Sequence, residues 1–362
     1  MKTMSLSWSW ASQSRRARGL ESPPIFLFGF NKWKTFICDW FPQYEPRFVR
    51  IKQWPLEFDL YWKRQLLRDP RTRVLAWQYK GPPKLKEFCV RHGIPFHYVE
   101  DGFLRSVALG ALRVPPLSLA FDAQDMYFNA KGPTDLEHIL GTYDFENDHA
   151  LMSRARAARQ QLLASRLSKY NSGHSLDIVS VYGEKTRKRV LVIGQVERDA
   201  SIAYGCATKV TNNDLVRLAG QENPEAQVIY KPHPEVLKGT AKAKSNPELV
   251  RDIAMILEQD ISLADAFETV DHVYTITSLS GFEALLRGIK VTTVGCPFYS
   301  GWGLTDDRQP NPRRGRTLSI DEVFAAAYIL YAKYLDPVTK MPIEIEQALD
   351  VLARMRAEQM AA

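Results

Sequence analysis

Short, almost entirely apolar runs alternate with segments of helical spacing along most of this chain. The runs at 25–30, 74–79 and 95–100 predict three buried strands. The segment at 84–93 has helical spacing and ends at Gly93, so it predicts a helix between the second and third strands. Strands that alternate with helices in this way are typical of a parallel sheet with crossover helices.

The same alternation resumes after a polar break at 168–175, which we interpret as the boundary between two domains. The second series of predicted strands comprises 189–195, 227–234, 272–277 and 290–295, and its predicted helices comprise 212–220, 248–259 and the segment through 281–288. Strands this apolar, joined by short connections, need a sheet that is covered on both faces. The pattern therefore predicts two doubly wound α/β domains with a cleft between them.

Two further segments have helical character, whereas the N-terminal segment has no period. Residues 134–167 are rich in Ala, Leu, Arg and Gln, and 321–335 predict one long helix packed across the domains. Residues 1–22 are polar and aperiodic, which predicts a loose arm. The predicted organisation is thus an arm at 1–22, an N-terminal domain at 23–168, a C-terminal domain at 169–318 and helices at 319–362.

Composition narrows the class of protein. The chain has 362 residues, of which 45% are hydrophobic and 25% charged, and these proportions exclude a disordered, collagen-like or disulfide-scaffold protein. Its four cysteines are scattered without ligand spacing, so we expect buried thiols in a reducing compartment and no zinc. No run approaches the roughly 18 apolar residues that a membrane helix needs, and the N-terminus would be a poor secretion signal. We therefore expect a cytoplasmic protein.

The net charge of +7 favours anionic partners. Two arginine clusters could meet a polyanion or an anionic membrane leaflet, namely Arg15, Arg16 and Arg18, and Arg313, Arg314 and Arg316. The tryptophans that could assist at a membrane are Trp8, Trp10, Trp33 and Trp40. The alternative is a solvated basic surface that favours anionic substrates. Neither GxxxxGKS/T nor GxGxxG occurs, which argues against sites for nucleoside triphosphates and dinucleotides.

Four loops at the predicted carboxyl ends of strands carry polar residues, and parallel sheets bind their ligands at that edge. Asp199 and Gln195 belong to the first loop, where Asp199 either points into the cleft or caps the following turn. The second loop is Lys231-Pro-His233-Pro234, in which the flanking prolines fix the backbone of His233. A cation and an imidazole at a strand end suit a phosphate, although a lone histidine is usually structural.

The third loop leads into a predicted helix, and the first turn of this helix contains Ser278, Ser280 and Gly281. Hydroxyls and free N–H groups at such a start form an anion site, and Gly281 permits close approach of a ligand or of neighbouring backbone. Glu283 either interacts favourably with the helix dipole or accepts hydrogen bonds from a ribose.

The fourth loop ends the strand at 95–100 with Glu100, Asp101 and a glycine, and Arg105 follows. Adjacent carboxylates can raise the pKa of one of them, which is useful for general acid or base work. Arg105 would neutralise one carboxylate or bind an anion. The alternative is a glycine-terminated turn with solvated acids.

Taken together, seven segments resemble the KpsC/LipA family of bacterial capsule polysaccharide proteins, which act as retaining β-Kdo glycosyltransferases. The segments are EDGFLRS (100–106), PPLSLAFD (115–122), LSKYN (167–171), GQVERDAS (194–201), YKPHPEV (230–236), TSLSGFEALLRG (277–288) and PFYSGWGLTDD (297–307). The resemblance covers roughly residues 25–340. Family members typically carry two such modules; this chain has one, and its GFNKWK (29–34) is more similar to the second module. WQYK (77–80) departs from the usual Trp-Gly-Arg/Lys form.

The resemblance implies a GT-B-like pair of Rossmann domains that face a central cleft, with CMP-Kdo as donor. It implies Asp199 as the nucleophile and His233 as a contact of the CMP phosphate. Ser278 and Glu283 would hold phosphate and ribose, and Glu100 or Asp101 would be the acid/base. The remaining implied donor contacts are Gln195, Lys231, Pro234, Ser280, Gly281 and Phe282, and the implied sugar or acceptor contacts are Arg105, Ser106, Lys169, Tyr170, Tyr299 and Trp302. Retention requires two inversions, and no metal is expected because cations and N–H donors can stabilise the leaving phosphate.

Three functions are open at this point. The first is transfer of Kdo to a Kdo-terminated glycolipid in capsule linker synthesis. The second is a sialyltransferase-like enzyme that uses another CMP-activated acidic sugar, and the third is a non-catalytic capsule-assembly module suggested by the basic charge. A lipid-linked acceptor predicts a peripheral position on the inner face of the cytoplasmic membrane, with capsule assembly proteins as further partners. We expect neither a nucleic acid partner nor a cofactor besides the donor substrate.

Overall fold

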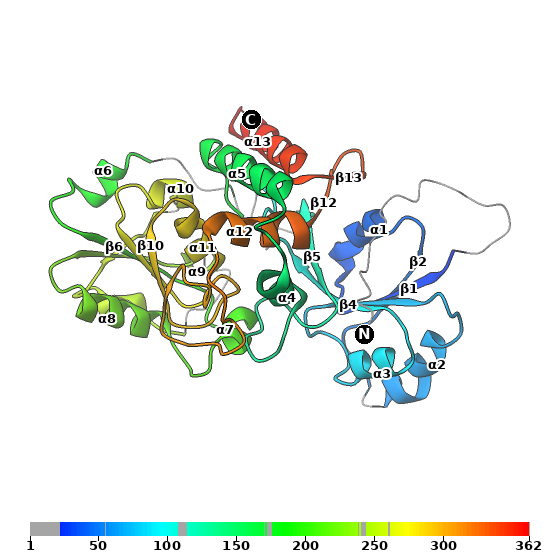
Figure 1. Cartoon of the computed structure of the whole chain (residues 1–362). Helices are drawn as coiled ribbons and strands as arrows, with labels where there is room; N and C mark the ends of the chain where they lie inside the picture. Colours follow the sequence, from blue (N-terminus) through cyan, green and yellow to red (C-terminus); the bar gives the residue numbers. More distant parts are fainter. Residues whose placement is uncertain are drawn as a thin grey trace.

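Two sheets, each built mainly from one half of the chain, form the framework of the protein (Figure 1). The computed structural model describes residues 22–54, 56–107, 114–169, 171, 176–237, 239, 244–259 and 261–361. All but the last residue of the predicted arm at 1–22, and with it Arg15, Arg16 and Arg18, lies outside the described residues.

The first sheet has seven strands in the order β13-β12-β5-β4-β3-β1-β2. They are β1 (Pro24–Phe28), β2 (Glu45–Val49), β3 (Arg73–Trp77), β4 (Phe96–Asp101), β5 (Ser118–Asp122), β12 (Lys333–Leu335) and β13 (Pro342–Ile343). The first four are parallel, and the other three extend the sheet with antiparallel pairs beyond β4. All residues of β1 are buried because its side chains alternate between two covered faces. One face is covered by η1 (Lys32–Phe36) and α1 (Ile37–Trp40), and the other by η2 (Phe58–Trp62), α2 (Lys63–Leu66) and α3 (Leu85–Arg91).

The second sheet has six parallel strands in the order β11-β10-β9-β6-β7-β8. They are β6 (Arg189–Ile193), β7 (Gln227–Lys231), β8 (Met255–Ile256), β9 (His272–Thr275), β10 (Lys290–Thr293) and β11 (Asp306–Asp307). The helices α7 (Ala200–Gly205) and α8 (Asn212–Glu222) cover one face, and α6 (Ile178–Tyr182), α10 (Leu263–Ala266) and α11 (Leu279–Leu286) cover the other. A capping box between Thr211 and Asp214 fixes the start of α8. The short α9 (Pro234–Leu237) follows β7.

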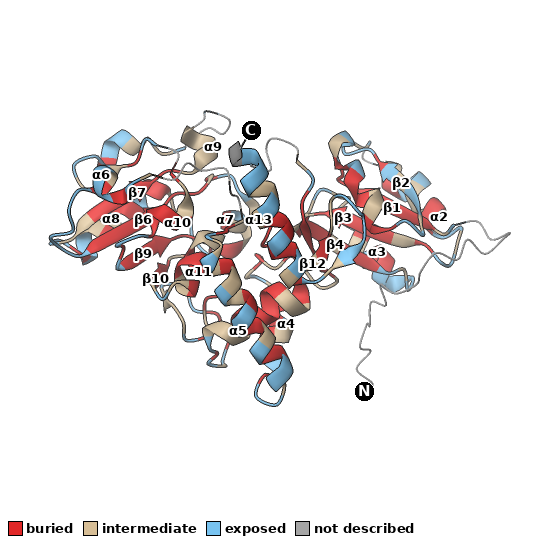
Figure 2. Cartoon of the chain, turned by 90° about the horizontal axis from the view of Figure 1, so that it is seen from above, coloured by how far each residue is buried: buried red, intermediate tan, exposed pale blue. Residues whose placement is uncertain are grey.

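A large apolar cluster joins the two halves of the molecule. The helices α4 (Asp135–Thr142), α5 (His149–Ala164), α12 (Ile320–Phe324), η5 (Ala325–Tyr331) and α13 (Ile345–Ala361) contribute to it. Within the cluster, the Phe103 ring from the first half lies 5.0 Å from that of Phe298 and 5.3 Å from that of Tyr328 in η5. Both views place α5 and α13 between the two sheets (Figures 1 and 2).

The helix predicted at 248–259 was wrong. Pro247–Val250 forms only a 3₁₀ turn, η4, and Met255–Ile256 pairs with β7 as an edge strand. The backbone N–H of Leu257 donates to the carbonyl of Tyr230 at 2.8 Å. The open edge of β7 therefore supplies backbone partners that override the helical periodicity of the segment.

The single helix predicted at 321–335 was wrong at its C-terminal end. A π-helical stretch ends at Tyr331, and Lys333–Leu335 continues as β12. Tyr334 pairs with Ser118 of β5, so the chain returns to the first sheet and covers its edge. Antiparallel pairing leaves no open edge on β5, which explains why the helix stops here.

The arginines of the cluster at 313–316 hold the fold together. Arg313 Nε and Arg314 Nε donate to the two carboxylate oxygens of Glu137 in α4, at 2.6 and 2.9 Å. Arg316 Nη1 donates to the carbonyl of Tyr143 at 2.7 Å. The prediction of a free basic surface here was wrong, because these cations neutralise a buried carboxylate and satisfy backbone carbonyls that join the second half to α4.

Candidate active site

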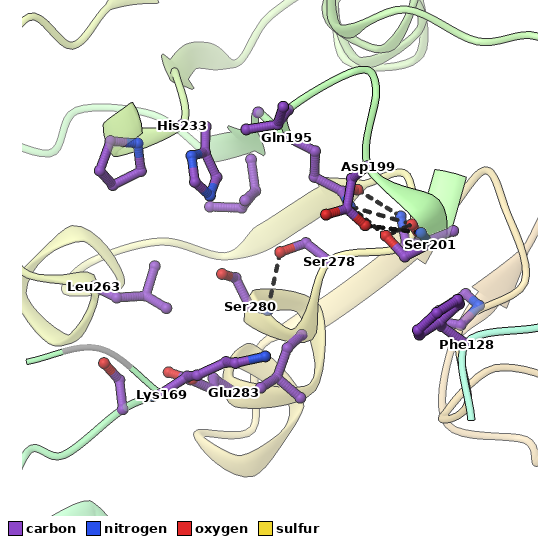
Figure 3. Close-up of a pocket in the computed structure, with 18 of the residues that line it drawn as sticks. Phe128, Lys169, Gln195, Asp199, Ser201, His233, Leu263, Ser278, Ser280 and Glu283 are labelled. Atoms are coloured by element: carbon purple, nitrogen blue, oxygen red, sulfur yellow. Dashed lines mark hydrogen bonds between the residues drawn. The ribbon is translucent and has the colours of Figure 1, made fainter. Parts of the chain in front are cut away.

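A cavity of about 340 Å³ lies where the carboxyl ends of both sheets meet. Its walls come from the end of β4 and the segments after β3 and β5 on one side, and from the segments after β6, β7, β8, β9 and β10 on the other. Figure 3 shows side chains from several of these loops around one space. The cavity thus brings together residues that are far apart in the sequence.

Asp199 lines the cavity and also caps a helix. Its Oδ1 accepts a hydrogen bond of 2.7 Å from the backbone N–H of Ser201, the second residue of α7. The side chain is exposed to the cavity, and its charge acts on His233 across it. Capping orients the carboxylate without removing it from the site, so both interpretations of Asp199 apply at once.

Gln195 connects the loop of β6 to the loop of β9. Its Oε1 accepts from the backbone N–H of Thr277 at 2.7 Å, and its Nε2 donates to the Thr277 hydroxyl at 3.2 Å. Asn212 also accepts from the backbone N–H of Gln195 at 3.0 Å. Gln195 lines the cavity, but its amide holds two walls of the cavity at a fixed spacing.

His233 is a neutral donor in the cavity wall. Burial lowers the pKa of His233 to about 4, although the charge of Asp199 opposes this effect. The Nδ1 atom accepts from the backbone N–H of Glu235 at 3.2 Å, which assigns the proton of the neutral ring to Nε2. The buried Nζ of Lys231 donates to the carbonyl of Ile261 at 3.0 Å. His233 therefore offers an N–H, while Lys231 stabilises the adjoining loop.

The start of α11 contributes an anion site and a buried carboxylate. Ser278 is the N-cap, and its hydroxyl accepts from the N–H of Ser280 at 3.2 Å. Glu283 is 3% exposed, and burial raises the pKa of its carboxyl group. Its Oε1 accepts from the N–H of Lys169 at 3.0 Å, whereas the buried Oε2 has no partner. An acceptor without a partner in a cavity wall suits a ligand hydroxyl.

Glu100 and Asp101 face this cradle from the end of β4, and their environments differ. Burial, and then the charge of Asp101, raises the pKa of Glu100 to about 7. Glu100 accepts from the N–H of Asp101 at 2.9 Å and from the Gln78 side-chain amide. Asp101 Oδ2 is paired at 2.7 Å with Arg105, which is 1% exposed, and its Oδ1 has no partner. Burial thus brings the pKa of Glu100 close to neutrality, whereas Asp101 pairs with a buried cation.

Several residues expected at the site lie outside the cavity wall. Gly281 makes room for Tyr299, because a Cβ there would lie 2.2 Å from the Tyr299 hydroxyl oxygen. Phe282 and Trp302 are buried in the apolar cluster, and the Trp302 indole donates to the carbonyl of Phe298 at 2.8 Å. Gly281, Phe282 and Trp302 therefore contribute to packing behind the cavity and do not line it.

Arg105 and Ser106 also lie outside the cavity wall. Arg105 Nη1 donates to the Ser106 hydroxyl at 2.9 Å. Lys169, Pro234, Ser280 and Tyr299 do line the cavity. Tyr170 lies outside the described residues.

Sequence reasoning missed several cavity residues, among them Gln78, Tyr127 and Phe128. Gln78 directly follows β3, so its place at a strand end was a signal that could have found it. Its φ of 48° lies in the left-handed region, which favours glycine. Tyr127 and Phe128 follow β5, which the apolar pattern did not predict as a strand.

Two other kinds of site are absent from the described residues. Nowhere in that part of the chain do three or more His, Cys, Asp or Glu side chains gather in a way that could hold a metal ion. Of the helices described, none combines the length and the apolar character that a membrane span needs.

Comparison with known proteins relates this architecture to a family. Residues 72–334 match the family described as capsule polysaccharide biosynthesis protein. The lipopolysaccharide-processing protein LpsZ of Rhizobium meliloti is 45% identical over 342 residues, which are 93% of this chain and 76% of LpsZ. The capsule polysaccharide modification protein LipA of Neisseria meningitidis serogroup B is 42% identical over 338 residues, which are 92% of this chain and 46% of LipA. The chain thus spans about half the length of LipA.

Two solved structures share the fold. The β-Kdo 2,4 transferase of Thermosulfurimonas dismutans KpsC has a TM-score of 0.77 and 30% identity, over 92% of this chain and 99% of that chain. The β-Kdo 2,7 transferase of the same KpsC has a TM-score of 0.72 and 29% identity, with the same coverage. These similarities confirm the predicted fold class, a GT-B-like α/β protein with two Rossmann-type sheets that face a cleft. The chain belongs to the KpsC/LipA family of capsule polysaccharide biosynthesis proteins.

Proposed function

We propose that this protein is a retaining glycosyltransferase that moves Kdo from CMP-Kdo to a Kdo-terminated glycolipid. One observation carries the proposal: a single cavity combines Asp199, the group formed by His233, Ser278 and Glu283, and Glu100 from the opposite sheet. The similarity to two Kdo transferases over nearly their whole length supports the choice of sugar.

The second half of the chain provides a cradle for the cytidylate. The Nε2–H of His233 and the N-terminus of α11 with Ser278 and Ser280 would donate to the phosphate. The partnerless Oε2 of Glu283 would accept from a ribose hydroxyl. These donors are fixed in advance by the fold, so they can stabilise the charge that develops on the departing phosphate.

Two displacements at the anomeric carbon would then retain its configuration. A carboxylate oxygen of Asp199 attacks that carbon, a new C–O bond forms, and the bond to the phosphate oxygen breaks with its electron pair on CMP. The acceptor hydroxyl next attacks the same carbon, gives its proton to Glu100, and displaces Asp199 as a free carboxylate. We assign the base to Glu100 rather than Asp101 because Asp101 is held in an ion pair with Arg105.

The direct test combines purified protein, CMP-Kdo and a Kdo-primed glycolipid with a short acyl chain. We expect a product that is one Kdo heavier, release of CMP, and by NMR the anomeric configuration of the donor. With CMP-sialic acid present at equal concentration, Kdo should be transferred preferentially. Preference for sialic acid would support the sialyltransferase-like alternative, and no product with either donor would contradict the proposal. The arginines at 313–316, one of the features that suggested a capsule-assembly module, pair within the fold, whereas the net charge of +7 that also suggested it remains.

Two substitutions of Gln78 should distinguish the strain of its left-handed backbone from its effect on the pKa of Glu100. Both Gln78→Ala and Gln78→Gly remove the amide that donates to Glu100, so both should raise its pKa and shift the acidic limb of activity to higher pH. Only glycine relieves the left-handed backbone, so Gln78→Gly should be more stable than Gln78→Ala by about 1 kcal/mol. Urea unfolding and a pH–rate profile measure the two effects. Equal stabilities, or profiles that match that of the unsubstituted protein, would contradict this account.

A further inference from the structure

The connection between β2 and β3 carries an unusual concentration of exposed apolar side chains. Thirteen large hydrophobic side chains are exposed among the residues that the structure describes, and seven of them lie within 48–67. These seven are Phe48, Ile51, Trp54, Leu56, Leu60, Tyr61 and Leu67. Trp54 is 75% exposed and Leu60 is 65% exposed. Contiguous exposed apolar groups of this kind mark interaction sites on soluble proteins.

The helical part of this connection is apolar on two sides. Its inner side packs Phe58 and Leu66 against the first sheet. Its outer side presents Leu60, Tyr61 and Leu67, at the spacing of one helical face. A helix that only covers a sheet would carry polar residues on this outer side, so the apolar outer side needs a partner.

Cations surround these apolar residues. Between 47 and 71 the chain has seven Lys or Arg and three Asp or Glu, a net charge of +4. Each of the three acids forms an ion pair within the segment: Glu57 with Arg50, Asp59 with Lys63, and Asp69 with Arg71. Lys52, Arg64 and Arg68 have no ion-pair partner among the described residues and are exposed. The uncompensated charge of this surface is therefore positive.

The loop that carries Trp54 is fixed to the helix. Glu57 accepts from the backbone N–H of Trp54 at 3.1 Å and from the indole of Trp62 at 2.9 Å, and it also pairs with Arg50. The Arg50 guanidinium lies 5.6 Å from the Trp54 ring centroid. The Trp54 indole is thus held outward on a folded loop and does not collapse onto the protein.

The Trp54 end of this surface lies at the edge of the first sheet that faces the cavity, and its Arg68 end lies towards the opposite edge, where β3 begins. The loop begins where β2 ends, and the parallel β4 ends at Glu100 and Asp101 on the same edge. β2 and β4 are three strand spacings apart, or about 14 Å. Figure 1 shows α2 beside α3 on one face of this sheet. A lipid headgroup at the Trp54 end of this surface would therefore lie within reach of the acceptor side of the cavity.

We propose that Ile51, Lys52, Trp54, Leu56, Leu60, Tyr61, Arg64, Leu67 and Arg68 form a docking surface for a bilayer that contains anionic phospholipids. Aromatic and aliphatic side chains would enter the interface, and the unpaired cations would contact the headgroups. The tryptophans expected at the membrane are different ones: Trp40 is buried, Trp33 packs on Phe36, and Trp8 and Trp10 lie outside the described residues. That the docked protein faces a lipid-linked acceptor rests on the proposed function, whereas bilayer binding does not.

Flotation with vesicles of phosphatidylcholine, with or without phosphatidylglycerol, tests the proposal without any sugar donor. The full chain should float with the phosphatidylglycerol vesicles, and added salt should weaken this binding. The triple variant Trp54→Ser/Leu60→Ser/Tyr61→Ser and the double variant Arg64→Glu/Arg68→Glu should each bind at least about tenfold more weakly. The matched control Val338→Ser/Met341→Ser, which changes exposed apolar residues beside β12 and β13 at the opposite edge of the sheet, should bind like the unsubstituted protein.

Activity separates this inference from the proposed function. The triple variant should keep its turnover of a short-chain soluble acceptor and lose turnover of the vesicle-embedded one. Failure of the unsubstituted protein to float, or flotation of the triple variant at full strength, would overturn the docking surface even if Kdo transfer is established. Self-association of the protein that the triple variant abolishes, without vesicle binding, would overturn it in favour of a contact between two copies.

Discussion

Replacement of Asp199 by asparagine is expected to reduce sugar transfer by on the order of 10³-fold or more. Asparagine caps a helix as well as aspartate does, so α7 should keep its start and the protein its stability. The amide cannot form the covalent intermediate, so only chemistry is lost. Turnover by initial-rate assay and thermal unfolding of the same preparation measure the two effects.

Intact-protein mass spectrometry gives an independent readout of the same step. With CMP-Kdo alone, the unsubstituted protein should gain the mass of one Kdo residue on Asp199, and Asp199→Asn should gain none. Asp199→Ala serves as a comparison, because it also removes the cap and should lose about 1 kcal/mol of stability. Turnover of Asp199→Asn within tenfold of the unsubstituted protein would exclude Asp199 as the nucleophile.

The pH dependence of the transfer rate should follow the ionisation of Glu100. Because burial raises its pKa to about 7, Glu100 gains its charge, and with it the capacity to accept a proton, only as the pH rises through this value. The rate should therefore fall about tenfold per pH unit below 7 and level off above it. Glu100→Gln should lose about 10²- to 10⁴-fold in rate together with this pH dependence.

The free energy of unfolding should fall over the pH range in which the transfer rate rises. The folded pKa of Glu100 lies above its ordinary value of 4.5, so the folded state binds more protons than the unfolded state between pH 4.5 and about 7. The contribution of Glu100 to the free energy of unfolding is therefore fully present below pH 4.5 and is lost as the pH rises from 4.5 to about 7. Glu100→Gln should therefore unfold at the same or a higher temperature than the unsubstituted protein at pH 8.

Asp101→Asn is the matched control for Glu100→Gln. It leaves the buried Arg105 guanidinium without its counterion, which should cost about 3 kcal/mol. Loss of rate in Glu100→Gln and loss of stability in Asp101→Asn would separate the two roles. If instead Glu100→Gln retained the pH profile and Asp101→Asn abolished it, the base would be Asp101.

The framework strands could be predicted from the sequence because a buried strand must be apolar at every position. The runs at 25–30 and 189–195 both became interior strands that pair with a neighbour on each side. The sequence pattern predicts helix at 255–256 and 333–335, where the structure has strands, because edge strands this short are held by backbone pairing with distant segments rather than by their own side chains.

The site could be predicted in part for a related reason. Polar residues that directly follow an apolar strand, such as Asp199 and His233, are placed at the carboxyl edge by the strand itself, and both line the cavity. Trp302 and Phe282 belong to equally distinctive segments, but their indole and ring point into the core. Sequence patterns locate a residue on an element, whereas packing decides which way its side chain faces.

The sequence by itself determined the two sheets and the edge at which chemistry would gather, because both follow from local periodicity and from where each apolar run ends. Only the tertiary structure decided that burial raises the pKa of Glu100, that the arginines at 313–316 pair with a buried carboxylate and backbone carbonyls, and which apolar side chains remain at the surface. These outcomes depend on burial and on partners supplied by distant parts of the chain, and a pKa or an ion pair exists only once those partners are in place.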